Sequence, residues 1–197
     1  MNLAENISNA FKVVEKTHAA VNKLLDRLKA EYDDEQYKLL SQKFLRWHSD
    51  NNCSGWCYQT FQLAYQRVQN GDAFKNGFLN GPIYIIEINF WQFDTPKIVV
   101  AKMDYGDLST WNEAYVGPSN YWRFAEPLHY YKDMFMREDL HDEIYKIVPR
   151  PHYKDKAAND YKFASAYVTT LELVDINGDN YKDEIFGAVE KLHDFVE

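Results

Sequence analysis

The sequence predicts a single α+β domain, in which an antiparallel sheet in the middle of the chain packs against an N-terminal helical hairpin and C-terminal helices. Two observations lead to this fold. Apolar residues with helical spacing lie toward the ends of the chain, and strand-like runs lie in the middle. The domain is divided into a helical part (1–48), an aromatic-rich β part (49–136) and an acidic, mainly helical part (137–197). At 197 residues with 46% hydrophobic residues, the chain is long enough to bury one core.

The N-terminal part predicts an α-hairpin or one bent helix. Apolar residues recur every three or four positions over Ile7–Leu28, and His18 occupies the one polar position of this stripe. Asp33-Asp34 is suited to cap a second helix, in which the spacing continues over Tyr37–Trp47. A histidine on an apolar stripe needs a partner, so we expect His18 to be a satisfied core or interface residue rather than a ligand or base.

The middle of the chain predicts the sheet. Asn80-Gly81-Pro82 opens a β-branched and aromatic run that ends at Phe93. Asp94-Thr95-Pro96 then turns the chain into a second run over Lys97–Tyr105, so these two runs form an antiparallel hairpin. The alternating aromatic residues of Trp56–Val68 favour a further strand, although the absence of helix breakers also permits a helix.

The C-terminal part predicts mainly helices. Arg137–Val148 is expected to form a short helix that ends at Pro149-Arg150-Pro151, followed by a polar linker over Tyr153–Asn159. Tyr161–Val174 fits either a helical stripe or a β-branched strand. The apolar spacing of Ile185–Val196 predicts the last helix.

Charge and composition argue against several classes of protein. The net charge is −8, and the lysines and arginines form no basic cluster of the kind that grips nucleic acid. The longest apolar stretches have the length of a strand, so we expect no membrane span. The first residues resemble no secretory signal and there are only two cysteines, which we expect to be free thiols, so a cytoplasmic protein is predicted.

The most specific local motif is an acidic loop near the C-terminus, Asp175–Asp183. It resembles the calcium loops of EF-hand and dockerin modules over nine residues. The sixth position is Asn180 rather than glycine, and the twelfth is Phe186 rather than a bidentate carboxylate, so we expect no stable metal site and favour a helix cap. The candidate metal ligands are Asp175, Asn177, Asp179 and Asp183.

A second group of possible metal ligands lies where the predicted helical part meets the β part: His48, Asp50, Cys53 and Cys57. Its spacing matches no common pair of zinc knuckles, so we interpret the two thiols as part of a loop edge. A nucleophilic role for Cys53 would need a base such as His18, His129 or His152 brought close by the fold.

Aromatic residues make up 16% of the chain and gather in its middle part. Rings beside carboxylates suit sugar stacking, cation recognition or a protein interface, whereas the alternative is a core built from rings. The candidate binding residues, for a ligand or a partner, are Asp104, Asp107, Trp111, Glu113 and Trp122.

Two functional classes follow from these observations. The first is a non-enzymatic binding or inhibitory protein that presents an acidic, aromatic-rich surface to a protein partner. The second is a small-ligand or carbohydrate-recognising domain, possibly a hydrolase, with a pocket near Asp104–Glu113. Phosphate loops, nucleophile elbows and dinucleotide fingerprints are absent from the sequence, so we expect no cofactor and name no catalytic residue.

Overall fold

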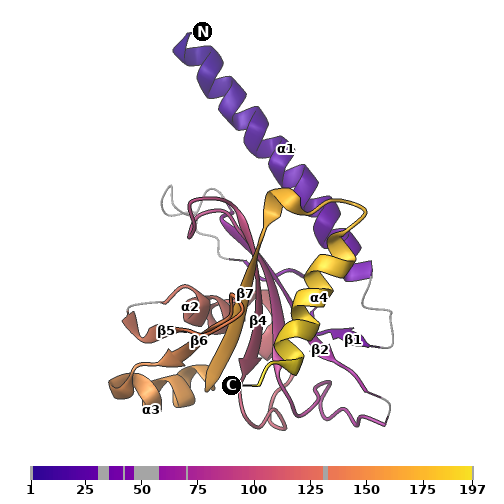
Figure 1. Cartoon of the computed structure of the whole chain (residues 1–197), viewed down its shortest axis with the longest axis vertical. Coiled ribbons are helices and arrows are strands. Elements are labelled where there is room, and N and C mark those ends of the chain that lie inside the picture. The colour runs from indigo at the N-terminus through magenta and orange to yellow at the C-terminus, as the bar shows by residue number, and fades with distance from the viewer. Residues whose placement is uncertain are drawn as a thin grey trace.

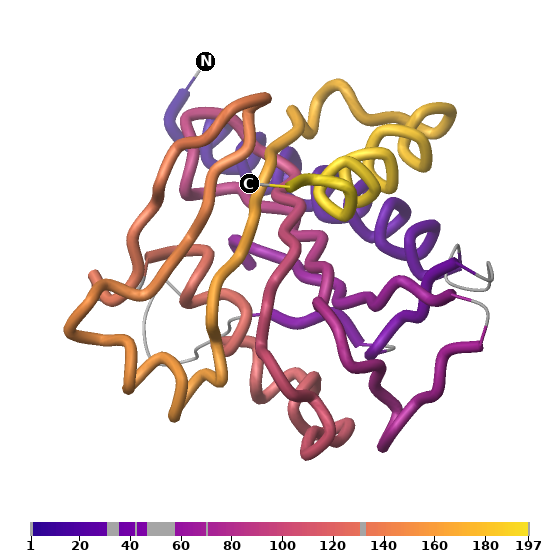
Figure 2. The backbone as a smooth tube through the Cα atoms, turned by 60° about the horizontal axis from the view of Figure 1, so that its bottom comes forward, coloured from indigo at the N-terminus to yellow at the C-terminus, as the bar shows by residue number. Residues whose placement is uncertain are grey.

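The computed structural model describes residues 2–30, 36–41, 43–46, 58–69, 71–130 and 133–196. The predictions for Asp33-Asp34, His48, Asp50, Cys53 and Cys57 lie outside these residues. The described chain forms a mixed α+β fold around one antiparallel sheet, as Figures 1 and 2 show.

The sheet has seven strands in the order β1-β2-β3-β4-β7-β6-β5, and all neighbouring strands are antiparallel. The predicted hairpin is confirmed, because β3 and β4 pair from Ile83↔Met103 to Asn89↔Lys97. The strands are β1 (Tyr37–Leu39), β2 (Thr60–Arg67), β3 (Ile83–Asn89), β4 (Lys97–Asp104), β5 (Phe135–Asp139), β6 (Tyr145–Pro149) and β7 (Ser165–Glu172).

Helical elements cover both faces of the sheet. The α-helices are α1 (Leu3–Ala30), α2 (Trp122–Leu128), α3 (Lys154–Lys156) and α4 (Tyr181–Asp194). The 3-10 helices are η3 (Glu113–Val116), η4 (Pro118–Asn120), η6 (Pro151–Tyr153) and η8 (Leu173–Asp175), and η7 (Ala157–Tyr161) is a π-helical turn.

The alternation of side chains along the central strands builds two cores. Ile86 and Ile88 of β3 face α1 and α4, which lie side by side on one face of the sheet (Figures 1 and 2). Ile83 and Ile85 face the opposite core, which is closed by α2 and by the segment after β4. Because β3 is buried along its whole length, its sequence is an almost continuous apolar run.

The predicted second helix over Tyr37–Trp47 is wrong. Tyr37–Leu39 is the edge strand β1, and Leu45 forms an isolated bridge with Gln62 of β2. The described part of this segment (36–41 and 43–46) therefore extends the sheet and does not form the second helix of the predicted hairpin. A short run of apolar residues fits both the helical period and the strand period. Here the segment pairs with the edge of β2 and therefore forms a strand.

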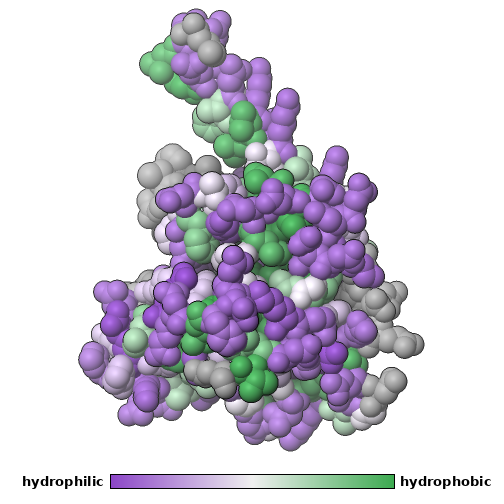
Figure 3. Space-filling model, in the orientation of Figure 1, coloured by the Kyte–Doolittle hydropathy of each residue, from purple (hydrophilic) through white to green (hydrophobic). Residues whose placement is uncertain are grey.

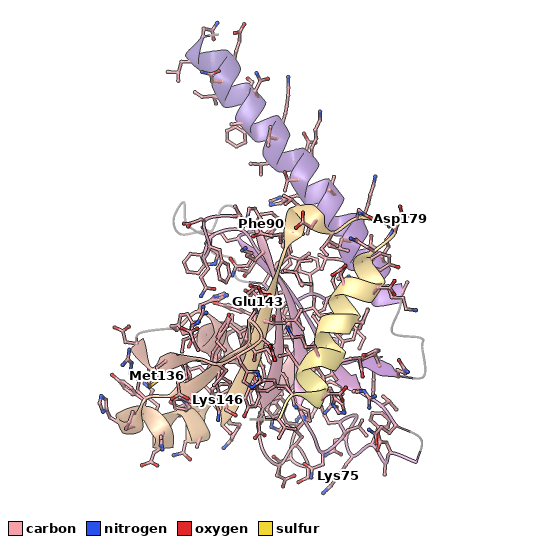
Figure 4. The ribbon with its side chains drawn as sticks, in the orientation of Figure 1. Lys75, Phe90, Met136, Glu143, Lys146 and Asp179 are labelled. Carbon is pink, nitrogen blue, oxygen red and sulfur yellow. The ribbon has the colours of Figure 1, made fainter. Side chains whose placement is uncertain are left out.

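The helix predicted over Arg137–Val148 is also wrong, because β5 and β6 form a hairpin there. Asp142 and Glu143 have φ values of 57° and 60°, and the amide of Ile144 donates to the carbonyl of His141. Positive φ at both central residues is the geometry of a type I′ turn, which usually carries Asn-Gly. Asn-Gly is absent here, so nothing in the sequence indicated this turn. Figure 4 labels Glu143 in the turn.

The remaining segments follow the predictions in part. The predicted strand over Trp56–Val68 is confirmed by β2, and the predicted last helix is confirmed by α4. Tyr161–Val174, which fitted a helix or a strand, contains β7. The segment predicted as a polar linker over Tyr153–Asn159 instead contains α3 and most of η7.

Candidate functional site

The first helix has two parts with opposite surroundings. In its C-terminal part, Val21, Leu25 and Leu28 are buried against the sheet. Residues 2–16 are all exposed, and Figure 1 shows this end of α1 extending away from the body of the protein. We call Leu3–Lys16 the projecting half of α1. The exposed apolar side chains on it are Leu3 (75%), Ile7 (51%), Phe11 (72%), Val13 (64%) and Val14 (41%).

The projecting half is amphipathic although nothing described covers it. Residues on an α-helix are about 100° apart, so Leu3, Ile7 and Val14 continue the stripe that the C-terminal part of α1 buries. Lys12 and Lys16 lie on the opposite side of the helix. Figure 3 shows apolar side chains along this end of the helix. An apolar stripe of this kind normally packs against something, so it is the strongest candidate for a contact surface.

His18 marks the place where α1 meets the sheet. Its half-buried ring packs edge-on against Phe61 at 5.8 Å and Phe90 at 6.5 Å between ring centroids. Figure 4 labels Phe90 near this end of the sheet. The ring contacts place His18 at the edge of the core, where the stripe passes from the exposed half of α1 to the buried half.

A groove runs beside α1 directly below the projecting half. Its volume is about 360 Å³, and its walls are α1 on one side and the segment around η8 on the other. Val174 of η8 is 79% exposed. We call this depression the α1 groove; apolar side chains and the cations Lys23 and Arg27 line it, together with Thr17, Ala20, Val21, Leu24, Leu173 and Ile176.

The predicted binding ring Trp111 lies in the core. It is 1% exposed and stacks on Tyr115, with 5.0 Å between the ring centroids. The guanidinium group of the buried Arg123 lies over the Tyr115 ring at 4.8 Å and over the Trp122 ring at 4.8 Å. Trp122 is half-buried and meets Tyr161 edge-on. Trp111 therefore offers no free ring face for stacking on a ligand.

The carboxylates near Trp111 hold turns. Asp104 accepts a hydrogen bond from the Gly106 amide at 2.8 Å. Asp107 accepts from the Ser109 amide and hydroxyl at 2.8 Å each, and these bonds lower the pKa of its carboxyl. Glu113 is exposed at the start of η3. The structure thus does not gather Asp104, Asp107, Trp111, Glu113 and Trp122 around one cavity.

The asparagine side chains of the acidic loop form hydrogen bonds with the backbone of the loop itself. The Asn177 side-chain oxygen accepts from the amides of Asp179 and Asn180, at 2.8 and 3.3 Å. Asn180 is the N-cap residue of α4, but its side chain bonds to Asn177 and Asp175 across the loop. Asp183 lies in the first turn of α4, and Figure 4 labels Asp179 beside α1. Among the described residues, no group of three or more His, Cys, Asp or Glu is placed to hold a metal ion.

A buried charged centre was missed by the sequence analysis. Glu87 of β3 is fully buried, and both its oxygens lie 3.0 Å from Nε2 of His129, which follows α2. Asn89 and Gln62 also donate to this carboxylate. Burial alone lowers the pKa of His129, but the charge of Glu87, the hydrogen bond to it and the charge of Glu126 together raise that pKa above its ordinary value.

This centre joins α2 to the sheet, with the Glu87 side chain fully buried and the His129 side chain 15% exposed. The carboxylate of Glu87 is shared among three donors from β2, the end of β3 and the end of α2. A buried charge with this many partners is satisfied, which is typical of a structural network. A lone glutamate inside an apolar strand run was the one available signal, and its partner lies 42 positions away in the sequence.

Comparisons with known proteins return no relatives: no family model, curated protein or solved structure matches this chain. Among the described residues, no helix is both long enough and apolar enough to cross a membrane.

Proposed function

We propose that this chain is a non-enzymatic binding protein whose partner docks on the projecting half of α1. One observation carries the proposal: five large apolar side chains on this half are between 41% and 75% exposed. Leu3, Ile7, Phe11 and Val14 follow the i, i+4, i+8, i+11 pattern of anchors that an amphipathic helix places in a partner's groove. The surface differs from the acidic, aromatic-rich one expected from the sequence, since many of those rings pack in the cores.

Two alternatives receive less support. A ligand pocket near Asp104–Glu113 would need Trp111 as a stacking ring, and that ring is buried. A lipid surface is usually met by a helix with a strongly basic polar face. The projecting half instead carries two lysines and two glutamates, Lys12, Lys16, Glu5 and Glu15, so its charges cancel. A protein surface fits this neutral, apolar helix better.

Site-specific photocrosslinking in cells of the native host tests the proposal. Benzoylphenylalanine is placed at Phe11, on the apolar side, and in a matched variant at Lys16, on the opposite side of the same helix. We expect a discrete protein adduct from position 11 that is absent from position 16. Equal adducts at both positions, or no discrete adduct at position 11, would contradict a docking face on this helix.

A further inference from the structure

We infer that the α1 groove binds a single-chain carboxylate, a fatty-acid-like anion whose apolar tail lies along α1 while its carboxylate faces Lys23 and Arg27. This site goes beyond the function proposed above and does not depend on it, because the two surfaces lie on different sides of the helix. Successive residues are about 100° apart around an α-helix, which places Ala20, Lys23 and Arg27 together and roughly opposite to Ile7 and Phe11.

The walls of the groove offer apolar surface to a ligand. Val21 of α1 is buried, whereas Leu24 of α1, Leu173 of η8 and Ile176 are half-buried, so part of each of these three side chains still contacts water. Each methylene group that such a surface removes from water is worth up to about fourfold in affinity. The volume of about 360 Å³ lies within the range of about 300–1,000 Å³ that small-molecule sites usually occupy.

The charged residues that line the groove are both cations. Lys23 and Arg27 are exposed and four positions apart, so they lie one helical turn from each other on the same side of α1. Although the chain has 30 acidic residues, none of those described lines the groove, and Asp175 and Asp179 of the neighbouring loop are not part of the lining. Within the described chain, neither cation forms an ion pair with a carboxylate. Two unpaired cations beside apolar side chains complement a ligand that has one anionic group and an apolar tail.

The guanidinium group of Arg27 is held in position by the loop that precedes α4. It lies over the ring of Tyr181, 5.6 Å from the centroid. On its other flank is Gly178, where an added Cβ would come within 2.6 Å of Nη1 of Arg27. The absence of a side chain at Gly178 therefore leaves the space that this guanidinium occupies. A cation that is already ordered loses less conformational freedom when it binds a carboxylate.

The order of residues along α1 sets the direction of the ligand. The groove extends from Thr17 to Arg27, which is about 15 Å along the helix axis. Lys23 and Arg27 lie in the C-terminal part of this span, so the carboxylate belongs there and the tail runs toward Thr17. Val13 lies on the same side of the helix one turn further on and is 64% exposed, so the apolar surface continues past the end of the groove.

Equilibrium dialysis of the full chain against radiolabelled octanoate, decanoate and dodecanoate, each below the concentration at which it forms micelles, tests the inference. We expect the affinity to rise about two- to fourfold with each added methylene group, because each one removes further apolar surface from water. Dodecyltrimethylammonium has the same tail as dodecanoate and the opposite charge. It should bind at least about tenfold more weakly, because two attractions to the cations become two repulsions.

Two pairs of variants place the ligand in the groove. Ala20→Phe fills the groove and should weaken dodecanoate binding at least about tenfold, because the ring displaces two or more methylene groups of the tail. Ala19→Phe is its matched control, since Ala19 is equally exposed but does not line the groove. Lys23→Gln should weaken binding about three- to fivefold, and Lys12→Gln, which removes the same charge outside the groove, should leave it unchanged.

Four results would each overturn the inference. They are no binding of any of the three carboxylates, equal affinity for dodecyltrimethylammonium, unchanged dodecanoate binding in Ala20→Phe, and co-sedimentation with phosphatidylglycerol vesicles without binding of free dodecanoate. The last result would assign the groove to a lipid surface. A protein adduct at Phe11 is expected in every one of these cases, because Phe11 lies on the other side of α1, so failure of this site leaves the proposed function standing.

Discussion

The same substitution, leucine to alanine, should have very different effects on stability at two positions of α1. Leu25 and Leu3 lie on the same helix and belong to the same apolar pattern, but Leu25 is 2% exposed and Leu3 is 75% exposed. Leu25→Ala removes a fully packed side chain and leaves a cavity between α1 and the sheet, which costs about 2–5 kcal/mol in comparable sites. Leu3→Ala removes a side chain that contacts mainly water, so we expect a change within about 0.5 kcal/mol.

The assay is urea unfolding followed by tryptophan fluorescence, in dilute solution without the partner. The free energies of unfolding of the two variants are compared with that of the wild type, and an unchanged slope against urea confirms that the comparison is valid. A loss of more than about 1.5 kcal/mol in dilute Leu3→Ala would mean that the projecting half packs on its own body, and would refute the division of α1.

Two further predictions concern the rest of the fold. The pKa of His129 is raised in the folded protein, so its contribution to stability is complete below the ordinary pKa of 6.5 and is lost as the pH rises through the folded value. The free energy of unfolding should therefore fall over that window in the wild type and stay flat in His129→Gln; a parallel slope in both would exclude the contact with Glu87 as the cause. Glu143 has a φ of 60° in the β5–β6 turn, so Glu143→Gly should raise the melting temperature by stabilising the protein about 0.5–1 kcal/mol. A lower melting temperature in that variant would contradict the turn geometry.

The sequence predicted the long periodic elements well. The buried stripe of α1, the β3–β4 hairpin and the stripe of α4 each extend over many residues, so several side chains support one periodicity. Short elements were predicted poorly. The strand β1 is three residues long, and the β5–β6 hairpin turns at Asp142-Glu143 without the residues that usually announce such a turn.

The site was less predictable than the fold for a physical reason. Ile7 and Leu28 belong to one stripe with one spacing, and the sequence does not record where the sheet beneath that stripe ends. Trp111 illustrates the converse: aromatic residues beside carboxylates suggested a surface, but the ring fills the core while Asp104 and Asp107 hold turns. The exposure of a side chain depends on contacts between segments that lie far apart in the sequence. The pairing of Glu87 with His129 likewise depends on how the fold brings distant segments together.

Hydrogen exchange along α1 tests the central claim most directly, because it measures the protection of the projecting half in the presence and absence of a partner. In the free chain, the amides of Leu3–Lys16 should exchange much faster than those of Val21–Leu28, since a helix without tertiary packing is only marginally stable. With the partner bound, the slow exchange should spread to Leu3–Lys16 while β5 and β6 stay unchanged. Protection of Leu3–Lys16 equal to that of Val21–Leu28 in the free chain, or no gain of protection there in the bound state, would contradict the account.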